Sequence, residues 1–219
     1  MDRTYRTWRH TVYFALVVIL AGFVVTGCLN GAAKENMDQY IKVKFDTKVE
    51  IRDDKLLIYY RVDNGLSEPI YLINRVFRWT SSGFSIDPNL VYTEIIGDRL
   101  QLTKAYINVP EDIDVEAPEV PFLTEIAASD RFEENISQPL PLEPYHPYAQ
   151  VKPSEVVRTF EQVQLVVGWL PSSKVSAQTV NRPEGLTLLS VNYTEVAREQ
   201  KLLLSTLNVK LPTRIQERK

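Results

Sequence analysis

Hydrophobic and polar residues alternate along most of the chain beyond its first forty residues. The clearest case is the stretch 56–62, where one face carries the apolar residues Leu56, Ile58, Tyr60 and Val62. Alternation of this kind, rich in β-branched and aromatic residues, predicts a half-buried β-strand. Asp53-Asp54 precedes the stretch and Asn64-Gly65 follows it, and both pairs are typical of turns. We therefore expect a strand that is bounded by a turn at each end.

The same period of two recurs further along the chain. The expected strands are 41–45, 49–51, 70–79, 90–96, 100–103, 105–109, 120–126, 131–137, 160–170, 186–193 and 202–211. In the strand 160–170, one face carries Val163, Leu165, Val167 and Trp169. Gly97-Asp98 predicts a hairpin, and Ala127–Asp130 predicts a further turn. Helical periodicity is poor, and only 154–161 and 194–204 are compatible with short helices.

Many short strands at regular spacing, with turn signals between them, are typical of an antiparallel β-sandwich. Over residues 40–212 the pattern resembles the immunoglobulin or fibronectin type III superfold. The Cys…Trp…Cys signature of antibody domains is absent, so the resemblance is one of pattern only. We predict an all-β, antiparallel, immunoglobulin-like sandwich over 40–212 and a polar C-terminal tail over 213–219. This fold implies no function by itself.

The first thirty residues follow a different pattern. Arg3, Arg6 and Arg9 precede 23 residues without a charge, from Thr11 to Ala33. A run of this length can span a bilayer, which takes about 20 residues. A basic start, an apolar centre and small residues at the end are also the parts of a secretory signal. The sandwich is therefore preceded by an apolar helix that is either a cleaved signal or an uncleaved membrane anchor.

The end of the apolar run, Val25-Thr26-Gly27-Cys28, resembles the lipobox of bacterial lipoproteins. All four positions fit that motif, and Cys28 is the one cysteine of the chain. The resemblance implies cleavage after Gly27 and acyl chains, such as palmitate, on Cys28. Residues 1–27 are then a lipoprotein signal peptide, and 28–39 are a lipidated polar tether.

Lipidation determines where the protein is expected to reside. Two or three acyl chains hold a protein stably on a membrane surface. By resemblance to Gram-negative lipoproteins, Leu29 after the cysteine favours the outer membrane of a bacterial cell envelope. The alternative is the inner membrane, with the apolar run as a single transmembrane helix. The expected partners are thus the membrane, through the lipid anchor, and another envelope protein.

Composition narrows the classes of function. The chain has 219 residues, two His and a net charge of −3. This balance gives no basic footprint for nucleic acid. A zinc site needs clustered His and Cys, and the sequence contains neither a nucleophile elbow nor a glycine-rich phosphate loop. We therefore predict that the protein is not an enzyme and binds no cofactor other than its covalent lipid.

An acidic run is the strongest remaining motif. Calcium takes six to eight oxygen ligands, often carboxylates at loop spacing, so the weak calcium candidates are Glu111, Asp112, Asp114 and Glu116. The run lacks the turn glycine of an EF-hand. Carboxylates that alternate with apolar residues also describe the solvated face of an edge strand, and this interpretation is preferred.

A proline-rich segment interrupts the strand pattern. Residues 139–153 hold five of the 13 prolines, with Tyr145, His146 and Tyr148 among them. These three residues are a candidate surface for a partner protein. The alternative, which we favour, is a crossover between sheets packed by its own side chains.

The sequence supports one main functional hypothesis and two alternatives. The main hypothesis is a lipid-anchored cell-envelope protein whose β-sandwich is a non-enzymatic module for protein binding or structural support. One alternative is an envelope hydrolase that acts on glycans through paired carboxylates, although the sequence does not identify the pair. The other is a single-pass membrane-anchored protein.

Overall fold

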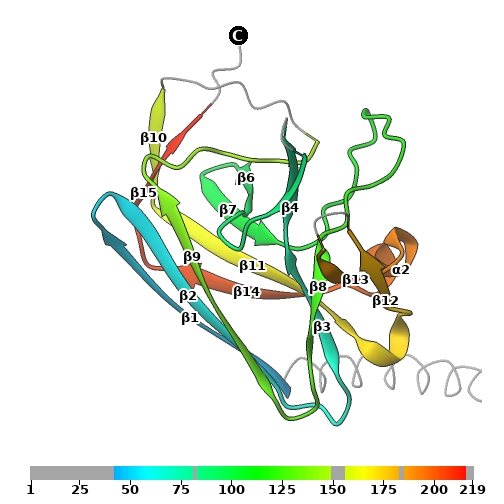
Figure 1. Cartoon of the computed structure of the whole chain (residues 1–219). Helices are drawn as coiled ribbons and strands as arrows, with labels where there is room; N and C mark the ends of the chain where they lie inside the picture. The colour runs from blue at the N-terminus through cyan, green and yellow to red at the C-terminus, as the bar shows by residue number, and fades with distance from the viewer. Residues whose placement is uncertain (1–41, 81–82, 149–155, 183–184, 216–219) are drawn as a thin grey trace, which may run out of the picture. The chain divides into compact units, whose positions relative to one another are not determined.

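The computed structural model describes residues 42–80, 83–148, 156–182 and 185–215. The signal peptide 1–27, Cys28 with the tether 28–39, and the alternative membrane anchor lie outside the described residues. Contacts divide the chain into a unit of Met1–Lys42 and a unit of Val43–Lys219, and the fold below is that of the second unit. This unit is mostly β-structure, with sheets packed as a sandwich or half-barrel (Figure 1).

One layer is a three-stranded antiparallel sheet in the order β1-β2-β9. Its strands are β1 (Val43–Arg52), β2 (Lys55–Asn64) and β9 (Arg131–Pro139). A two-residue turn joins β1 to β2, and both of its residues have positive φ, 52° at Asp53 and 54° at Asp54. Aspartate tolerates the left-handed region that such a hairpin turn requires. The predicted turn at this pair and the predicted strand 56–62 are therefore confirmed.

The second layer is an eight-stranded sheet with the path β12-β13-β8-β3-β11-β7-β6, and β14 pairs with β11 off this path. Its strands are β3 (Ile70–Arg75), β6 (Tyr92–Ile96), β7 (Arg99–Lys104), β8 (Phe122–Ile126), β11 (Gln162–Pro171), β12 (Gln178–Asn181), β13 (Thr187–Ser190) and β14 (Lys201–Leu207). The turn between β6 and β7 is Gly97-Asp98, as predicted, with Gly97 at φ 63°. Because glycine adopts positive φ without a steric penalty, it suits this two-residue hairpin.

Smaller elements complete the unit. Two further strand pairs are β4 (Phe77–Thr80) with β5 (Gly83–Ile86), and β10 (Val157–Phe160) with β15 (Leu211–Arg214). A 3-10 turn at Ser172–Lys174 follows β11. The helix α2 (Tyr193–Glu199) begins at Asn192, whose side chain accepts a hydrogen bond from the Thr194 N–H and so caps the helix.

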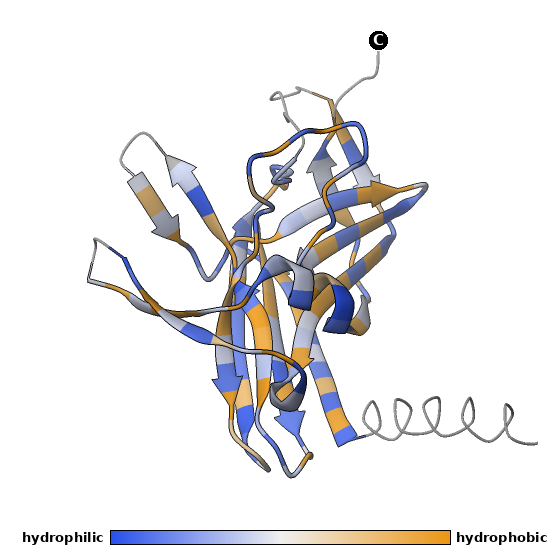
Figure 2. Ribbon diagram, turned by 90° about the vertical axis from the view of Figure 1, so that its right-hand side faces the viewer, coloured by the Kyte–Doolittle hydropathy of each residue, from blue (hydrophilic) through white to orange (hydrophobic). Residues whose placement is uncertain are grey.

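The main core lies between the two layers. The inward face of β2 and the predicted face of β11 are buried together in this core: Leu56, Ile58, Tyr60, Val62, Val163, Leu165, Val167 and Trp169. Figure 2 shows the alternation of hydrophobic and hydrophilic positions along the strands. β11 is also buried on its other face, where Leu170 packs in a second cluster with Val196 of α2. A strand covered on both faces reads as a continuous apolar run.

β3 and β7 lie on the same side of β11. Residues 163–169 of β11 pair with β14, and the same stretch pairs with β7 up to Val167 and with β3 from Gly168 onward. A strand has two edges, so β7 and β3 share the edge opposite β14 and meet end to end there. Lys104 faces Val167 in the register, and Ile73 faces the next residue. At this junction the end of β7 lies beside β3, although the two strands are far apart in the sequence.

Several predictions about strands and helices were wrong. The sheets are not purely antiparallel, because β7 and β11 run parallel. The expected strand 70–79 is broken at Val76 into β3 and β4, and the segment 157–160 is the strand β10 instead of a helix. β15 reaches Arg214 and thus enters the segment expected to be a tail. The short helix expected in 194–204 is present as α2, followed by β14.

The expected strand 105–109 is absent for a visible reason. The N–H of Tyr106 donates to Gln200 Oε1 at 2.8 Å, and Gln200 Nε2 donates back to the Tyr106 carbonyl at 3.1 Å. The side chain of Gln200 thus takes the place that a neighbouring strand would have, because it bonds both backbone groups of Tyr106. Gly168 permits this arrangement, because a Cβ there would lie 2.7 Å from Gln200 Oε1 and 2.9 Å from the Cβ of Ala105. The alternating pattern alone does not reveal such a side-chain substitute.

Candidate functional site

A cluster of four polar side chains lies between the two layers. Glu134 of β9 is its centre: Lys104 Nζ lies 2.5 Å from Oε2, and the Tyr60 hydroxyl donates to the same oxygen at 2.5 Å. The other carboxylate oxygen, Oε1, accepts a hydrogen bond from Asn74 Nδ2 at 3.5 Å. Lys104 also donates to the carbonyl of Pro88 at 2.5 Å. Lys104 is 0% exposed and Asn74 is 1% exposed, so the cluster is buried.

Strand geometry brings these four residues together. Tyr60 and Glu134 face each other in the β2–β9 register and both point inward. Lys104 is the last residue of β7, at the junction with β3. β3 carries a register shift between Leu72 and Arg75, and Asn74 lies within it. Irregularities of this kind re-aim side chains and are common beside functional sites.

Burial shifts the proton equilibria of the cluster. Desolvation lowers the pKa of Lys104, and the neighbouring Glu134 carboxylate opposes this shift without cancelling it. Desolvation and the charge of Glu134 raise the pKa of the Tyr60 hydroxyl well above its usual value. A buried cation of this kind is tolerated only with a well-placed partner and satisfied hydrogen bonds. The four side chains are therefore one interdependent unit.

A depression of about 490 Å³, called the inner depression below, opens beside the cluster. Its lining combines polar groups with apolar ones and includes Asn74, Arg75, Thr124, Phe132, Glu134 and Leu188. Asn74 Oδ1 is buried, and within the described ranges it has no hydrogen-bond partner. An unpartnered buried acceptor is costly. This depression therefore suits a group with an apolar body and a hydrogen-bond donor.

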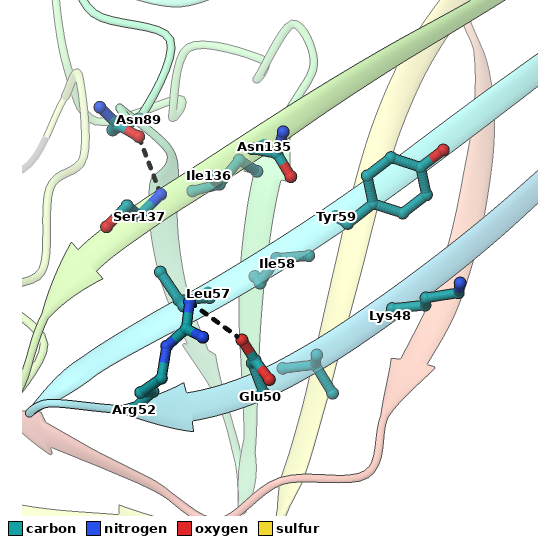
Figure 3. Close-up of a pocket in the computed structure, with 11 residues that line it drawn as sticks. Lys48, Glu50, Arg52, Leu57, Ile58, Tyr59, Asn89, Asn135, Ile136 and Ser137 are labelled. Atoms are coloured by element: carbon teal, nitrogen blue, oxygen red, sulfur yellow. Dashed lines mark hydrogen bonds and ion pairs between the residues drawn. The ribbon is translucent and has the colours of Figure 1, made fainter.

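A second depression, of about 520 Å³, lies on the outer face of the β1-β2-β9 sheet. Figure 3 shows its lining side chains on the three strands, with an ion pair of 3.5 Å between Arg52 and Glu50. Tyr59 stands on β2, and Lys48 Nζ lies 5.9 Å from the centre of its ring. At the far border, Asn89 Oδ1 accepts the N–H of Ser137 at 2.8 Å. Exposed charged side chains dominate this outer depression, so it offers fewer buried polar groups for recognition than the inner depression does.

β9 lies at the edge of its sheet (Figure 1), and residues of β9 line both depressions. In the β1–β2 hairpin, the pair Arg52–Lys55 that closes the two-residue turn is hydrogen-bonded, and every second pair after it is hydrogen-bonded as well. Tyr59 belongs to such a pair, so its N–H and C=O point toward β1. Its partner on the other side, Asn135, therefore points its N–H and C=O away from β2, and so does Glu133 two residues earlier. Ser137 follows the same rule and donates to Asn89. In the part of the chain that the structure describes, no group pairs with the free backbone groups of Glu133 and Asn135.

The proline-rich segment is half-buried at the residues that the sequence singled out. The Tyr145 ring lies 5.7 Å from that of Tyr92, and Tyr145 donates to the Phe77 carbonyl at 3.3 Å. The Tyr148 hydroxyl accepts the N–H of Glu119 at 2.8 Å. These contacts pack the segment against the sheet through its own side chains. Its role as a partner surface stays a prediction.

His146 gives this segment a pH dependence. Burial lowers the pKa of His146, and Glu94, whose Oε1 lies 4.0 Å from Nε2, only partly opposes the shift. Its Nδ1 accepts the Tyr148 N–H at 3.1 Å, a bond that protonation removes. The unfolded chain thus binds this proton more readily, so stability falls as the pH drops below about 6.5.

We expect the melting temperature of His146→Gln to rise relative to wild type as the pH is lowered from 7.5 to 5.5. The relative gain should be on the order of 2 °C, measured by thermal unfolding of both proteins side by side. Using the difference between the two proteins removes the contribution of other groups, such as Glu119. A difference that stays constant across this range would contradict the assignment.

The acidic run does not form the edge strand that was expected. Residues 105–121 contain no strand, and the side chains of Glu111, Asp112, Asp114 and Glu116 are exposed there. Among the residues with described positions, no group of three or more His, Cys, Asp and Glu side chains is arranged to hold a metal ion. The structure thus places these carboxylates on an irregular, solvated segment.

Sequence reasoning overlooked the cluster around Glu134. One signal for it was present: Glu134 shares the inward parity of Phe132 and Ile136, a charged residue at an apolar position. Charges at such positions are rarely fully buried unless they are paired. The identity of the partners was not readable, because they come from three other strands.

Comparison with known proteins adds no further assignment. No protein-family model, no curated protein and no solved structure matches the chain. No helix among the described residues has both the length and the apolar character needed to cross a membrane.

Proposed function

We propose that the chain is a lipid-anchored protein of a bacterial cell envelope that binds an extended segment of another protein along the free edge of β9. Binding, not catalysis, is its proposed role. The observation that carries this proposal is the unpaired backbone of Glu133 and Asn135, at an edge bordered by two depressions. The anchor rests on the resemblance of Val25-Thr26-Gly27-Cys28 to a lipobox.

Strand addition explains why the two depressions matter together. An added strand gains affinity from main-chain hydrogen bonds and specificity from pockets for alternate side chains. Successive side chains of such a strand point to opposite faces of the sheet. One set would enter the depression at Asn74, and the other set would cross the outer face at Tyr59. The side chain at Asn74 should carry a hydrogen-bond donor, because Oδ1 is an unpartnered acceptor.

Asn135→Pro is the variant that tests this proposal. Proline removes an N–H that faces away from β2, so the β2–β9 ladder stays intact while the edge loses a donor. We expect a partner that is photo-crosslinked in cells at position 133 to be captured about tenfold less, which corresponds to about 1.4 kcal/mol. The crosslinking residue replaces Glu133, which is exposed.

The matched control is Asn135→Ala, which keeps the backbone N–H and should retain capture. A crosslinker at the exposed Lys174, in the 3-10 turn after β11, gives the background. Thermal unfolding shows that each variant is folded. Equal capture at positions 133 and 174, or capture that is insensitive to Asn135→Pro in a folded variant, would refute edge binding.

Glycan hydrolysis is the alternative function, and one observation favours it: Glu133 and Glu134 both line the inner depression. A glycosidase needs two carboxyl groups on either side of one bond. Consecutive strand residues point to opposite faces, and Glu134 is already bound by Lys104 and Tyr60. These facts support binding over hydrolysis. Release of reducing sugar from purified envelope glycan, abolished in Glu134→Gln, would reverse this preference.

The sandwich class is established, whereas an immunoglobulin-like order of its strands is a finer prediction. Both sheets of an immunoglobulin domain are antiparallel, whereas β7 and β11 pair in parallel here. The parallel β7–β11 pair therefore argues against an immunoglobulin-like topology within the sandwich class.

A further inference from the structure

The Glu134 carboxylate bridges an amine and a carboxamide. One oxygen lies 2.5 Å from Lys104 Nζ, and the other accepts from Asn74 Nδ2 at 3.5 Å. A carboxylate in this position can accept a proton from the amine and deliver one to the amide nitrogen. Those are the two proton transfers required when an amine displaces ammonia from a carboxamide. The cluster thus contains a nucleophile, an electrophile and a proton carrier.

The backbone places the amine and the carboxamide next to each other. Lys104 faces Val167 across the β7–β11 pair, and Ile73 faces Gly168 on the same edge of β11. Asn74 is the next residue of β3, so the two strand ends meet at these two side chains. Both face the sandwich interior, where Val167 also lies. Both side chains reach the same Glu134 carboxylate, which thus lies between the amine and the carboxamide.

The surroundings favour attack of the Lys104 amine on the Asn74 carboxamide over hydrolysis of that carboxamide. Lys104, Asn74 and Tyr60 are at most 1% exposed, and the Phe132 ring lies 6.2 Å from that of Tyr60. Desolvation lowers the pKa of Lys104, which increases the share of the neutral, nucleophilic amine. Holding the reacting groups in place removes most of the entropy cost of bringing them together. The carboxamide of Asn74 borders the depression but is only 1% exposed, which limits attack by water, the competing nucleophile.

The geometry points to an intramolecular amide bond between Lys104 Nζ and Asn74 Cγ, formed with Glu134 as the catalytic proton carrier. This inference is independent of the proposed partner binding. In the first step Glu134 takes a proton from the Lys104 ammonium, the freed lone pair attacks Cγ, and the C=O electrons move to Oδ1. In the second step Glu134 delivers that proton to Nδ2, the C=O reforms, and the Cγ–Nδ2 bond breaks. Glu134 then takes the extra proton from the former lysine nitrogen and passes it to the departing ammonia, which leaves as ammonium. No oxidant, reductant or cofactor is needed.

The bond would join the end of β7 to the end of β3. Oδ1 remains a carbonyl oxygen in the product, so the acceptor that lines the inner depression is retained. Lys104 would no longer be a site for trypsin. Crosslinking two segments that are distant in sequence restricts the unfolded chain, as a disulfide does, in a domain that has no cysteine among its described residues.

Mass spectrometry of the purified full chain tests the inference. We expect the wild-type protein to be about 17 Da, the mass of one ammonia, lighter than its processed and lipidated sequence requires. Tryptic digestion should yield a branched peptide that joins residues 62–75 to residues 100–131, with Lys104 uncleaved. Fragmentation of that peptide should place the branch between Lys104 and Asn74. The peptide map does not depend on how the N-terminus is processed.

Two variants are matched controls. Glu134→Gln removes the proton carrier and keeps the side-chain shape, and Lys104→Arg keeps the charge opposite Glu134 but cannot form the bond. Both should show the full mass and no branched peptide. The wild-type peptide map decides the question even where a variant fails to fold. Linear peptides alone would overturn the inference, and so would a loss of about 17 Da without the Lys104–Asn74 branch, as an asparagine succinimide would give.

Discussion

Replacing Glu134 with Ala is expected to lower the free energy of unfolding by about 3–5 kcal/mol, because it leaves a buried lysine without its carboxylate. The side chain of Lys104 is 0% exposed and that of Glu134 is 14% exposed, so water cannot compensate for the loss. Tyr60 loses its acceptor in the same variant, and Tyr60 is also 0% exposed. Breaking one partner of such a cluster therefore destabilises far more than breaking an exposed ion pair.

The melting temperature of the purified chain measures this effect, and a decrease of about 10 °C or more is expected. Fluorescence reports it well, because Trp169 is 0% exposed and lies in the main core. The double variant Lys104→Met, Glu134→Gln removes the charge and keeps an acceptor for Tyr60, so it should recover the part of the loss that the unpaired charge causes, without restoring the amide bond. Arg52→Ala, which removes an exposed ion pair of the outer face, serves as the control and should change little. A Glu134→Ala protein that melts within 2 °C of wild type would refute the interdependence of the cluster.

Cys28→Ala is expected to remove the protein from the outer-membrane fraction almost completely. The proposed anchor is two or three acyl chains on this residue, and each buried CH₂ contributes about 0.8 kcal/mol to membrane binding. With a net charge of −3, the chain has no basic surplus that could replace the lipid at an anionic surface. At least about tenfold less protein should therefore sediment with the outer membrane.

Membrane fractionation with intact-mass measurement tests this prediction. The wild-type protein should begin at Cys28 and carry acyl mass, whereas Cys28→Ala should carry none. Asn30→Ala, two residues beyond the cysteine, is the matched control and should keep both the lipid and the location. A wild-type protein that retains Met1 and lacks lipid mass would refute the anchor and favour the single transmembrane helix.

Local patterns were enough to predict much of the fold. The alternation at 56–62 and the hairpin turns at Asp53-Asp54 and Gly97-Asp98 are confirmed, as is the buried face of β11. These features depend on side-chain period and on positive φ, which are properties of a few neighbouring residues. The turn at Ala127–Asp130 is confirmed in the same way, with the Asp130 N–H bonded to the Ala127 carbonyl at 3.2 Å.

The predictions that were wrong concern partners far apart in the chain. The alternation in 99–104 and 162–171 is the same for either pairing direction, so it did not reveal the parallel β7–β11 pair. The pattern at 105–109 is that of a strand, but Gln200 bonds the backbone of Tyr106 instead. In both cases the deciding contact is made by residues remote in sequence.

The sequence by itself determined the strand-rich class and the main turns, because each depends on adjacent residues, and it is the basis of the prediction that Cys28 is lipidated. Only the tertiary structure decided which strand lies at an open edge and which buried charge meets which partner. In the sequence only Glu134 stands out, as a charge at an apolar position, and Lys104 and Asn74 join it in a reactive set because β7 and β3 meet on one edge of β11. Hydrophobic burial is non-directional, so a pattern of apolar residues identifies the buried faces without specifying their neighbours.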